Sequence, residues 1–220
     1  MFALTVCLSS VNCKELDTTS GIVGQNPLLA GEIATFTDMA HDARLSKRLS
    51  YVLRHEPESI GMELDAAGWV DLAVLVAKLR KSGVNLDESD VHEVVAKNDK
   101  KRFEVVDGKI RAAQGHSIDV NLGLASVPPP DVLWHGTVER FIDSILTQGL
   151  MPSGRQHVHL SESFDTANIV GSRRGKPALL KVASQKMANE GHEFFVSSNG
   201  VWLTSHVPTN YIEQVDRRPN

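Results

Sequence analysis

The chain has 220 residues, of which 41% are hydrophobic and 23% are charged, and its formal net charge is −4 at pH 7. This length accommodates one large domain or two small ones, and no apolar run approaches the roughly 20 residues that a membrane-spanning helix needs. Most of the negative charge lies in residues 1–40, so a nucleic-acid partner would have to be bound by a local group of cations rather than by the field of the whole protein.

Residues 1–40 differ from the rest of the chain, because they are rich in Thr, Ser, Gly and Asn and show no clear periodicity. We expect a flexible extension there. The two cysteines of the chain, Cys7 and Cys13, both lie in this segment. Neither disulfides nor a thiolate zinc site can therefore hold the remainder together, which fits a reducing, cytoplasmic setting.

The segment from residue 45 to residue 57 predicts an amphipathic helix that ends beside two functional side chains. Pro57 disfavours helical geometry in the residue before it, so the helix should stop near Arg54 and His55. A guanidinium and an imidazole at such an end suit an oxyanion. The apolar residues at helical spacing that should face a core are Leu45, Leu49, Val52 and Leu53.

Two more helices and a β-hairpin are predicted before residue 114. Asp71 is placed to cap a helix over residues 72–79, and the acidic run 87–90 opens another. Asp107-Gly108, between two short apolar segments, is a strong hairpin signal. Three helices followed by a hairpin outline a winged helix, which is a small module that often binds nucleic acid.

Residues 128–130 are three prolines that mark a stiff boundary. Beyond them we expect two helices, near residues 139–147 and 163–170. Five apolar segments predict strands, over residues 132–135, 158–160, 178–182, 194–196 and 201–203. The predicted fold class is therefore α+β, with a small, mostly antiparallel sheet in the second lobe.

Five polar segments carry arginines, lysines and histidines outside the predicted core. A glycine beside a polar residue lets backbone N–H groups approach a ligand closely, and a histidine so placed can bond a sugar hydroxyl or a phosphate. A basic loop punctuated by glycine can grip a pyrophosphate or an RNA backbone, although a solvated turn is an equally good interpretation. The segments are residues 100–103, 114–117, 134–137, 154–161 and 170–177.

A metal site is an alternative interpretation of the fourth segment. In a strand, His157 and His159 share a face with Arg155, and His135 could supply a third ligand. Cations around an imidazole disfavour a dication, so we expect no metal. No serine or cysteine nucleophile with a matching base is visible, and a site dominated by Arg and His suits a substrate that carries its own nucleophile, such as a phosphate ester.

In this order along the chain, the segments resemble the RNA (tRNA) 2′-phosphotransferase family, from about Leu45 to Val215. The shared motifs are Leu-Ser-Lys-x-Leu-Ser-x-x-Leu-Arg-His at 45–55, Arg-Phe at 102–103, Ile-Arg-Ala-x-Gln-Gly-His-Ser at 110–117, His-Gly-Thr at 135–137, Arg-Gln-His-Val-His-Leu-Ser at 155–161, Gly-x-Arg-Arg-Gly at 171–175 and Asn-Gly-Val-Trp-Leu-Thr at 199–204. The resemblance implies a winged-helix RNA-binding lobe over residues 41–114. It also implies an ADP-ribosyltransferase-like lobe that binds NAD over residues 115–220.

The resemblance also implies an activity. An internal RNA 2′-phosphate, as at a tRNA splice junction, would be transferred to NAD through an ADP-ribosylated RNA intermediate. The products would be 2′-OH RNA, ADP-ribose 1″,2″-cyclic phosphate and nicotinamide. The expected partners are thus a tRNA-like RNA with a 2′-phosphate and NAD as a consumed co-substrate, and we expect a monomer.

Site residues follow from the matched motifs. The family's Arg-His-Arg-Arg set falls on Arg54, His55, Arg102 and Arg155; the first three would hold the 2′-phosphate, and Arg155 would stabilise charge at phosphorus in the second step. The residues implied for NAD are His135, Gly136 and Thr137, with His159, Ser161, Arg173 and Arg174 as weaker candidates.

Two alternatives stay open at this point. An ADP-ribosyltransferase acting on protein or on terminal phosphates of nucleic acid would share the NAD lobe but would not need Arg54 and Arg102 around an internal phosphate. A non-catalytic RNA-binding protein would have lost the motifs of the second lobe, which are intact in this sequence.

Overall fold

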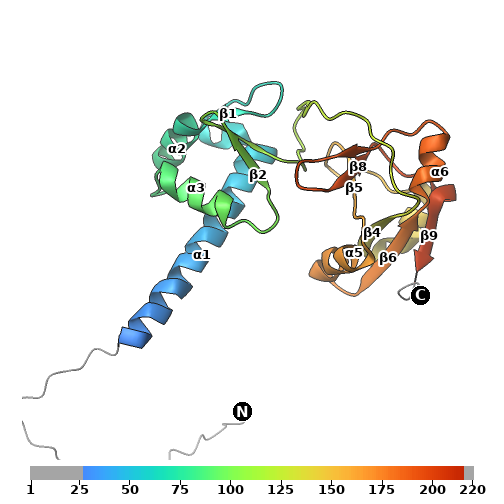
Figure 1. Cartoon of the computed structure of the whole chain (residues 1–220), viewed down its shortest axis with the longest axis horizontal. Helices are drawn as coiled ribbons and strands as arrows, with labels where there is room; N and C mark the ends of the chain where they lie inside the picture. The colour runs from blue at the N-terminus through green and yellow to red at the C-terminus, as the bar shows by residue number, and fades with distance from the viewer. Residues whose placement is uncertain (1–26, 216–220) are drawn as a thin grey trace, which may run out of the picture. The chain divides into compact units, whose positions relative to one another are not determined.

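The computed structural model describes residues 27–215 (Figure 1), and side chains are described from residue 41 onward, except that of Arg174. Most of the predicted extension and both cysteines lie outside the described residues. Residues 27–40 belong to a helix, and the flexibility that we expected for residues 1–40 stays a prediction. Within residues 27–215, no helix is both long and apolar enough to cross a membrane.

The α+β class is confirmed, and the first part of the chain contains three α-helices and a three-stranded antiparallel sheet of order β1-β3-β2. The elements in chain order are α1 (Pro27–Arg54), the 3-10 turn η1 (Pro57–Ile60), β1 (Val70–Asp71), α2 (Leu72–Lys81), α3 (Glu88–Ala96), β2 (Phe103–Val106) and β3 (Lys109–Ala112). The end of α1 at Arg54 and the paired strands of the predicted hairpin are thus confirmed.

Local capping chemistry explains why these elements begin where they do. The Asp71 carboxylate accepts a hydrogen bond from the Val74 amide at 3.2 Å, as predicted for the start of α2. At the start of α3, Asp87 and Asp90 form a reciprocal capping box. In the β2–β3 turn, Asp107 and Gly108 have φ values of 48° and 73°. Positive φ at both central residues of a hairpin turn favours an Asp-Gly pair.

A hydrophobic core joins α1, α2, α3 and the sheet beneath the end of α1. Leu49, Val52 and Leu53 are completely buried in it, as the spacing of apolar residues in α1 predicts. They pack with Leu75, Leu79, Val91 and Ile110 from the other elements. Because Leu53 directly precedes Arg54, this core anchors the last turn of α1.

The second part of the chain contains two three-stranded antiparallel sheets where we expected one. Their orders are β4-β6-β9 and β5-β8-β7. The elements are β4 (Leu133–Val138), η2 (Glu139–Phe141), α4 (Ile142–Gln148), β5 (Val158–Leu160), α5 (Phe164–Gly171), η3 (Ser172–Arg174), β6 (Pro177–Val182), α6 (Ser184–Asn189), β7 (Phe195–Val196), β8 (Trp202–Thr204), η4 (Thr209–Tyr211) and β9 (Ile212–Val215). Helix α6 and strand β9, which are both short, are not predicted by the sequence pattern.

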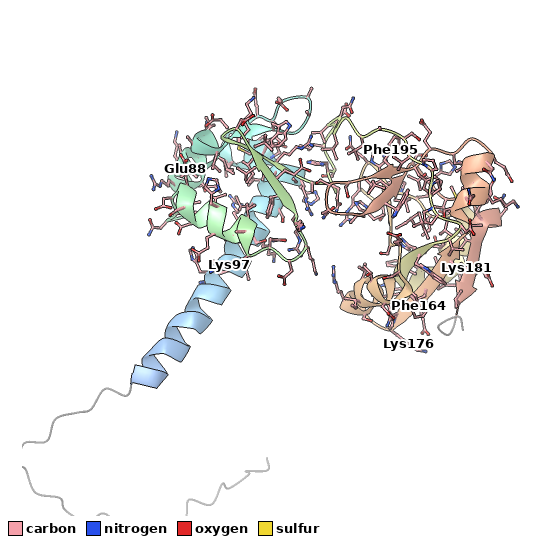
Figure 2. All side chains as sticks on the ribbon, viewed as in Figure 1. Glu88, Lys97, Phe164, Lys176, Lys181 and Phe195 are labelled. Carbon is pink, nitrogen blue, oxygen red and sulfur yellow. The ribbon has the colours of Figure 1, made fainter. Side chains whose placement is uncertain are left out.

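The sheet β4-β6-β9 is covered on both faces. Successive residues of a strand point to opposite faces, so Leu133 and Leu180 join one core whereas Trp134 and Leu179 join another. The second of these cores lies under α5, which carries Phe164 (labelled in Figure 2). The ring of Phe164 meets that of Trp134 edge-on, with centroids 5.3 Å apart.

Helix α5 lies unusually close to β4. A Cβ atom on Gly136 would lie 2.9 Å from the Gly171 amide nitrogen and closer still to the Ala167 carbonyl oxygen. A Cβ on Gly171 would lie 2.7 Å from the Thr137 carbonyl oxygen. Helix packing therefore accounts for glycine at both positions, and the contact of Gly136 with NAD that the resemblance implies stays a prediction.

Replacing Gly136 by alanine is expected to lower the free energy of unfolding by about 3 kcal/mol, because the new methyl group has to displace helix backbone. Gly83→Ala is the control, since no described atom lies within 4 Å of its Cβ position and only the cost of its φ of +91° remains, about 1 kcal/mol. Urea denaturation measures both. Equal losses would show that α5 moves aside at little cost.

Candidate active site

The last turn of α1 presents Arg54 and His55, both half-buried, above the first core. Arg54 donates from Nη2 to the carbonyl oxygen of Arg102 at 3.4 Å, so it reaches the residue that opens the hairpin. Burial, together with the nearby cations Arg102 and Arg155, lowers the pKa of Arg54 to about 10. Arg54 therefore lies within electrostatic range of both Arg102 and Arg155, the other two arginines of the predicted set.

Two further cations extend this cluster. The pKa of Arg102 is lowered by burial and by Arg173. The pKa of Lys100 is lowered by burial, by Arg173 and by Arg102. Arg173, which the resemblance offered as an NAD contact, thus lies with the cations around Arg102.

The loop before β8 is bound to β2 and to the residues around Arg102 that precede this strand. The Asn199 side-chain amide donates to the carbonyl oxygen of Lys100 at 2.9 Å, and the Ser198 hydroxyl bonds to Glu104. Glu104 in turn pairs with Arg111 at 2.8 Å. These bonds tie the two parts of the chain together next to the cation cluster.

His159, in β5, positions Arg155. Its Nδ1 lies 3.4 Å from Arg155 Nη1, and its Nε2 lies 2.6 Å from the Gln114 side-chain oxygen. Burial and the neighbouring cations, Arg155 first and then Arg54, lower the pKa of His159 to about 3. The ring is therefore neutral, accepts from Arg155 at Nδ1 and donates to Gln114 from Nε2.

Residues 114–117, which we call the strap, join these groups to the end of α1. The strap amide of Ser117 donates to the Arg54 carbonyl oxygen at 2.9 Å, and the His116 carbonyl accepts from Gln156 at 3.0 Å. Gly115 has a φ of 89° and lies against the Arg54 side chain, where a Cβ would sit 3.6 Å from Nη1. The sequence analysis singled out this segment but did not assign Gln114 or Ser117 to the site.

His116 itself does not have the exposed role that the sequence suggested. Its side chain is 1% exposed, and neither ring nitrogen has a hydrogen-bond partner among the described residues. Burial, followed by Arg54 and Arg111, lowers its pKa to about 4. It cannot bond a sugar or a phosphate from this position, and it lines a small cavity with His157 and His159.

The residues implied for NAD are only partly brought together. His135 Nδ1 bonds to the carbonyl oxygen of His159 at 3.0 Å, and burial lowers the pKa of His135. Backbone bonds of 2.8 and 2.7 Å pair Trp134 with Ser161, so Ser161 lies beside β4. Thr137 is half-buried on β4. Arg174 belongs to η3, and its side chain lies outside the described part of the structure.

The described residues contain no group of three or more His, Cys, Asp or Glu side chains that could hold a metal ion. The ring of His157 instead packs edge-on against Phe195 of β7, with centroids 5.9 Å apart. Both nitrogens of His159 have protein partners. The cations gathered around Arg54 could bind an oxyanion through charge-assisted hydrogen bonds.

Acid should destabilise the protein through His116. Between pH 7 and pH 5 the unfolded chain protonates this imidazole, whose ordinary pKa is 6.5, while the folded chain does not. The free energy of unfolding should fall by about 2 kcal/mol from this residue alone. His116→Leu, which cannot titrate, should lose less stability than the wild type over the same interval by that amount in urea denaturation.

His92→Leu is the matched control, because the His92 side chain is exposed on α3 in the folded protein. A change in pH dependence that His92→Leu causes as well would not be specific to the buried ring. His159 also lowers the free energy of unfolding as the pH falls, but it does so equally in the wild type and both variants. Its contribution is therefore absent from the differences between them. An unaltered pH dependence in His116→Leu would contradict the buried neutral imidazole.

Known proteins are similar to this chain over most of its length. A family profile described as "RNA 2'-phosphotransferase, Tpt1 / KptA family" matches residues 40–206, a range that includes the end of α1, the hairpin, the strap and β5. Proteins named "Probable RNA 2'-phosphotransferase" align over most of this chain and nearly all of their own length. That of Acaryochloris marina is 53% identical over 174 residues, 78% of this chain and 96% of its own length.

The protein of that name from Agrobacterium fabrum is 54% identical over 169 residues, 76% of this chain and 91% of its own length. The one from Hahella chejuensis is 51% identical over 176 residues, 79% of this chain and 95% of its own length. Identity of this extent, together with the profile match, shows common descent and a common fold. The chain therefore belongs to the RNA 2′-phosphotransferase, Tpt1/KptA family.

Proposed function

We propose that this protein is an NAD-dependent RNA 2′-phosphotransferase that removes an internal 2′-phosphate from RNA. In the first step an oxygen of the 2′-phosphate bonds to the anomeric carbon of the nicotinamide ribose, and the bond to nicotinamide breaks. In the second step the ribose 2″-hydroxyl oxygen bonds to phosphorus, and the bond from phosphorus to the RNA 2′-oxygen breaks. The hydroxyl proton ends on that 2′-oxygen, which leaves 2′-OH RNA and ADP-ribose 1″,2″-cyclic phosphate.

The convergence of Arg54, Arg102 and Arg155 carries the proposal. Arg102 and Arg155 both repel the Arg54 guanidinium, and burial adds a desolvation cost at Arg54 and Arg102. A phosphate dianion bound among them would relieve both terms through charge-assisted hydrogen bonds. The substrate supplies the nucleophile, so no enzyme carboxylate is required as a base in the first step.

The proposal divides the substrate between the two parts of the chain. The first part, three helices with the β2–β3 hairpin, fits a winged-helix RNA-binding lobe. The second part, two antiparallel sheets with α5 against one of them, fits an ADP-ribosyltransferase-like lobe. His135, Thr137 and Ser161, which lie on or beside β4, would hold the ribose and pyrophosphate of NAD.

In this proposal, three of the features that the resemblance connected with NAD have other roles. They are His159, Gly136 and the basic loop with Arg173. His159 orients Arg155, and Gly136 serves the packing of α5. Arg173, near Lys100 and Arg102, adds positive charge on the side of the RNA phosphate. We propose a monomeric enzyme that acts in the cytoplasm on a tRNA-like substrate.

The proposed function is tested by incubating the full chain with an RNA that carries one internal, radiolabelled 2′-phosphate. Label should move to a cyclic phosphate of ADP-ribose only when NAD is present, leaving a 2′-OH RNA. Stable ADP-ribosylation of RNA termini or of protein, without loss of the 2′-phosphate, would support the alternative ADP-ribosyltransferase. Binding of RNA with no reaction in NAD would support a non-catalytic RNA-binding protein.

Arg102→Ala should raise the Kd for the 2′-phosphorylated RNA by about 10- to 100-fold, the value of one charge-assisted hydrogen bond. The Kd for the matching 2′-OH RNA should change less than about threefold, because the lost partner is the phosphate. Lys109→Ala, which removes an exposed cation from the same hairpin, is the control. Equal weakening of both RNAs by Arg102→Ala would refute phosphate selectivity in binding assays.

Arg155→Ala should slow the second step by about 100-fold or more, because a cation that stabilises charge at phosphorus is lost. The ADP-ribosylated RNA should then accumulate in a quenched time course with NAD. Arg140→Ala, an exposed arginine whose guanidinium lies over the Phe141 ring, should leave the course unchanged. A course in which product forms slowly without any intermediate would place Arg155 in the first step instead.

A further inference from the structure

We infer that Ser117 is a positioning residue that holds His55 as the Nδ1–H tautomer and so leaves Nε2 as the atom that meets the RNA 2′-phosphate. This inference rests on the proposed function and deepens it, because it assigns a task to a residue outside the Arg-His-Arg-Arg set. It starts from three contacts that Ser117 makes with the end of α1.

The first two contacts fix the Ser117 hydroxyl. Its Oγ lies 2.9 Å from His55 Nδ1 and 3.4 Å from the carbonyl oxygen of Arg54. The third contact is the backbone bond from the Ser117 amide to the same carbonyl, at 2.9 Å, which sets the position of the whole residue. Ser117 therefore cannot move away from His55 without breaking the backbone hydrogen bond between the strap and Arg54.

The tautomer of His55 follows from which of these atoms can donate a hydrogen bond and which can only accept one. A carbonyl oxygen only accepts hydrogen bonds, whereas a neutral imidazole nitrogen can either donate or accept. The Arg54 carbonyl also lies in the last turn of α1, at the negative end of the helix dipole. The single hydroxyl proton of Ser117 therefore points to that carbonyl, and the oxygen lone pair accepts from Nδ1–H of His55.

The charges around His55 keep the ring neutral before RNA binds. The pKa of His55 is lowered by burial first, and then by the positive charges of Arg54 and Arg155. The other ionisable groups that face it are the Tyr51 phenol, whose ring centroid is 6.4 Å from that of His55 and whose hydroxyl bonds to Glu56, and the neutral His116 of the strap. With Nδ1 protonated, Nε2 carries the lone pair.

A phosphate dianion beside Nε2 reverses this balance, since it favours the protonated ring. Nε2 then takes one proton from solvent and donates it in a hydrogen bond to a phosphate oxygen, while Nδ1–H remains on Ser117. The ring does not have to rotate or exchange tautomers, so the contact is ready when RNA arrives. Without the Ser117 hydroxyl, either nitrogen could carry the proton and the ring could turn.

The tautomer can be measured directly in the free full-length protein by long-range ¹H–¹⁵N NMR of the histidine rings. The His55 signals are assigned by their loss in His55→Gln. In the wild type, Nδ1 should have the shift of a protonated ring nitrogen and Nε2 that of an unprotonated one. Ser117→Ala should move both shifts toward the opposite tautomer, and Ser117→Thr, which keeps the hydroxyl, should restore the wild-type pattern.

Binding supplies the second readout, with the 2′-phosphorylated RNA and its 2′-OH counterpart in the absence of NAD. Ser117→Ala should weaken the phosphorylated RNA by about 5- to 10-fold at pH 7 and the 2′-OH RNA by less than about twofold. Ser117→Thr should stay within about twofold of the wild type for both. Thermal unfolding of the three proteins shows that each one is folded at the assay temperature.

The outcomes separate the inference from the proposed function. A wild-type ring protonated at Nε2, or equal weakening of both RNAs by Ser117→Ala, would overturn the inference even if the enzyme transfers phosphate to NAD. Failure of every variant and of the wild type to distinguish the two RNAs would instead overturn the proposed function. Proton uptake by the wild type when it binds phosphorylated RNA in weak buffers, reduced in Ser117→Ala, would support the inference.

Discussion

The backbone hydrogen bond from the Ser117 amide to the Arg54 carbonyl holds the site together, because it joins the end of α1 to the strap. The same strap bonds Gln114 to His159, and through His159 it reaches Arg155. Arg54 and Arg155, which are 101 positions apart in the sequence, are thereby held within electrostatic range of each other. If the strap moved, the two parts of the chain would each keep a hydrophobic core, but the cations would separate.

Holding cations so near one another has an electrostatic cost that the rest of the fold offsets. Arg54 sits directly above completely buried leucines of the first core, and Arg155 is held by the neutral imidazole of His159. Neutral histidines are well suited to this environment, because a charged ring would add to the repulsion. In the function that we propose, this cost would favour a multiply charged anion, since such a ligand removes more of the repulsion than a neutral one does.

Gly115 and Gly136, which both lie beside polar residues in the sequence, have different structural roles. Gly115 has a positive φ and lies against the Arg54 guanidinium, so it belongs to the site. Gly136 lies beneath α5 and admits helix backbone, although its His-Gly-Thr motif suggested contact with a ligand. His116 is a similar case, because a polar segment with a histidine looked exposed and its ring is buried. Sequence pattern alone does not say on which side of a strand or loop the tertiary neighbours lie.

The sequence by itself determined the features that depend on near neighbours along the chain. The apolar spacing of α1 and its end at Arg54, the Asp71 and Asp87 caps and the Asp107-Gly108 turn follow from helix periodicity, capping and turn chemistry. Only the tertiary structure decided that His159 orients Arg155, that Ser117 bonds to His55 and that the second lobe has two sheets. These features depend on contacts between residues far apart in the chain, where side-chain packing and burial, rather than local backbone preference, select the arrangement.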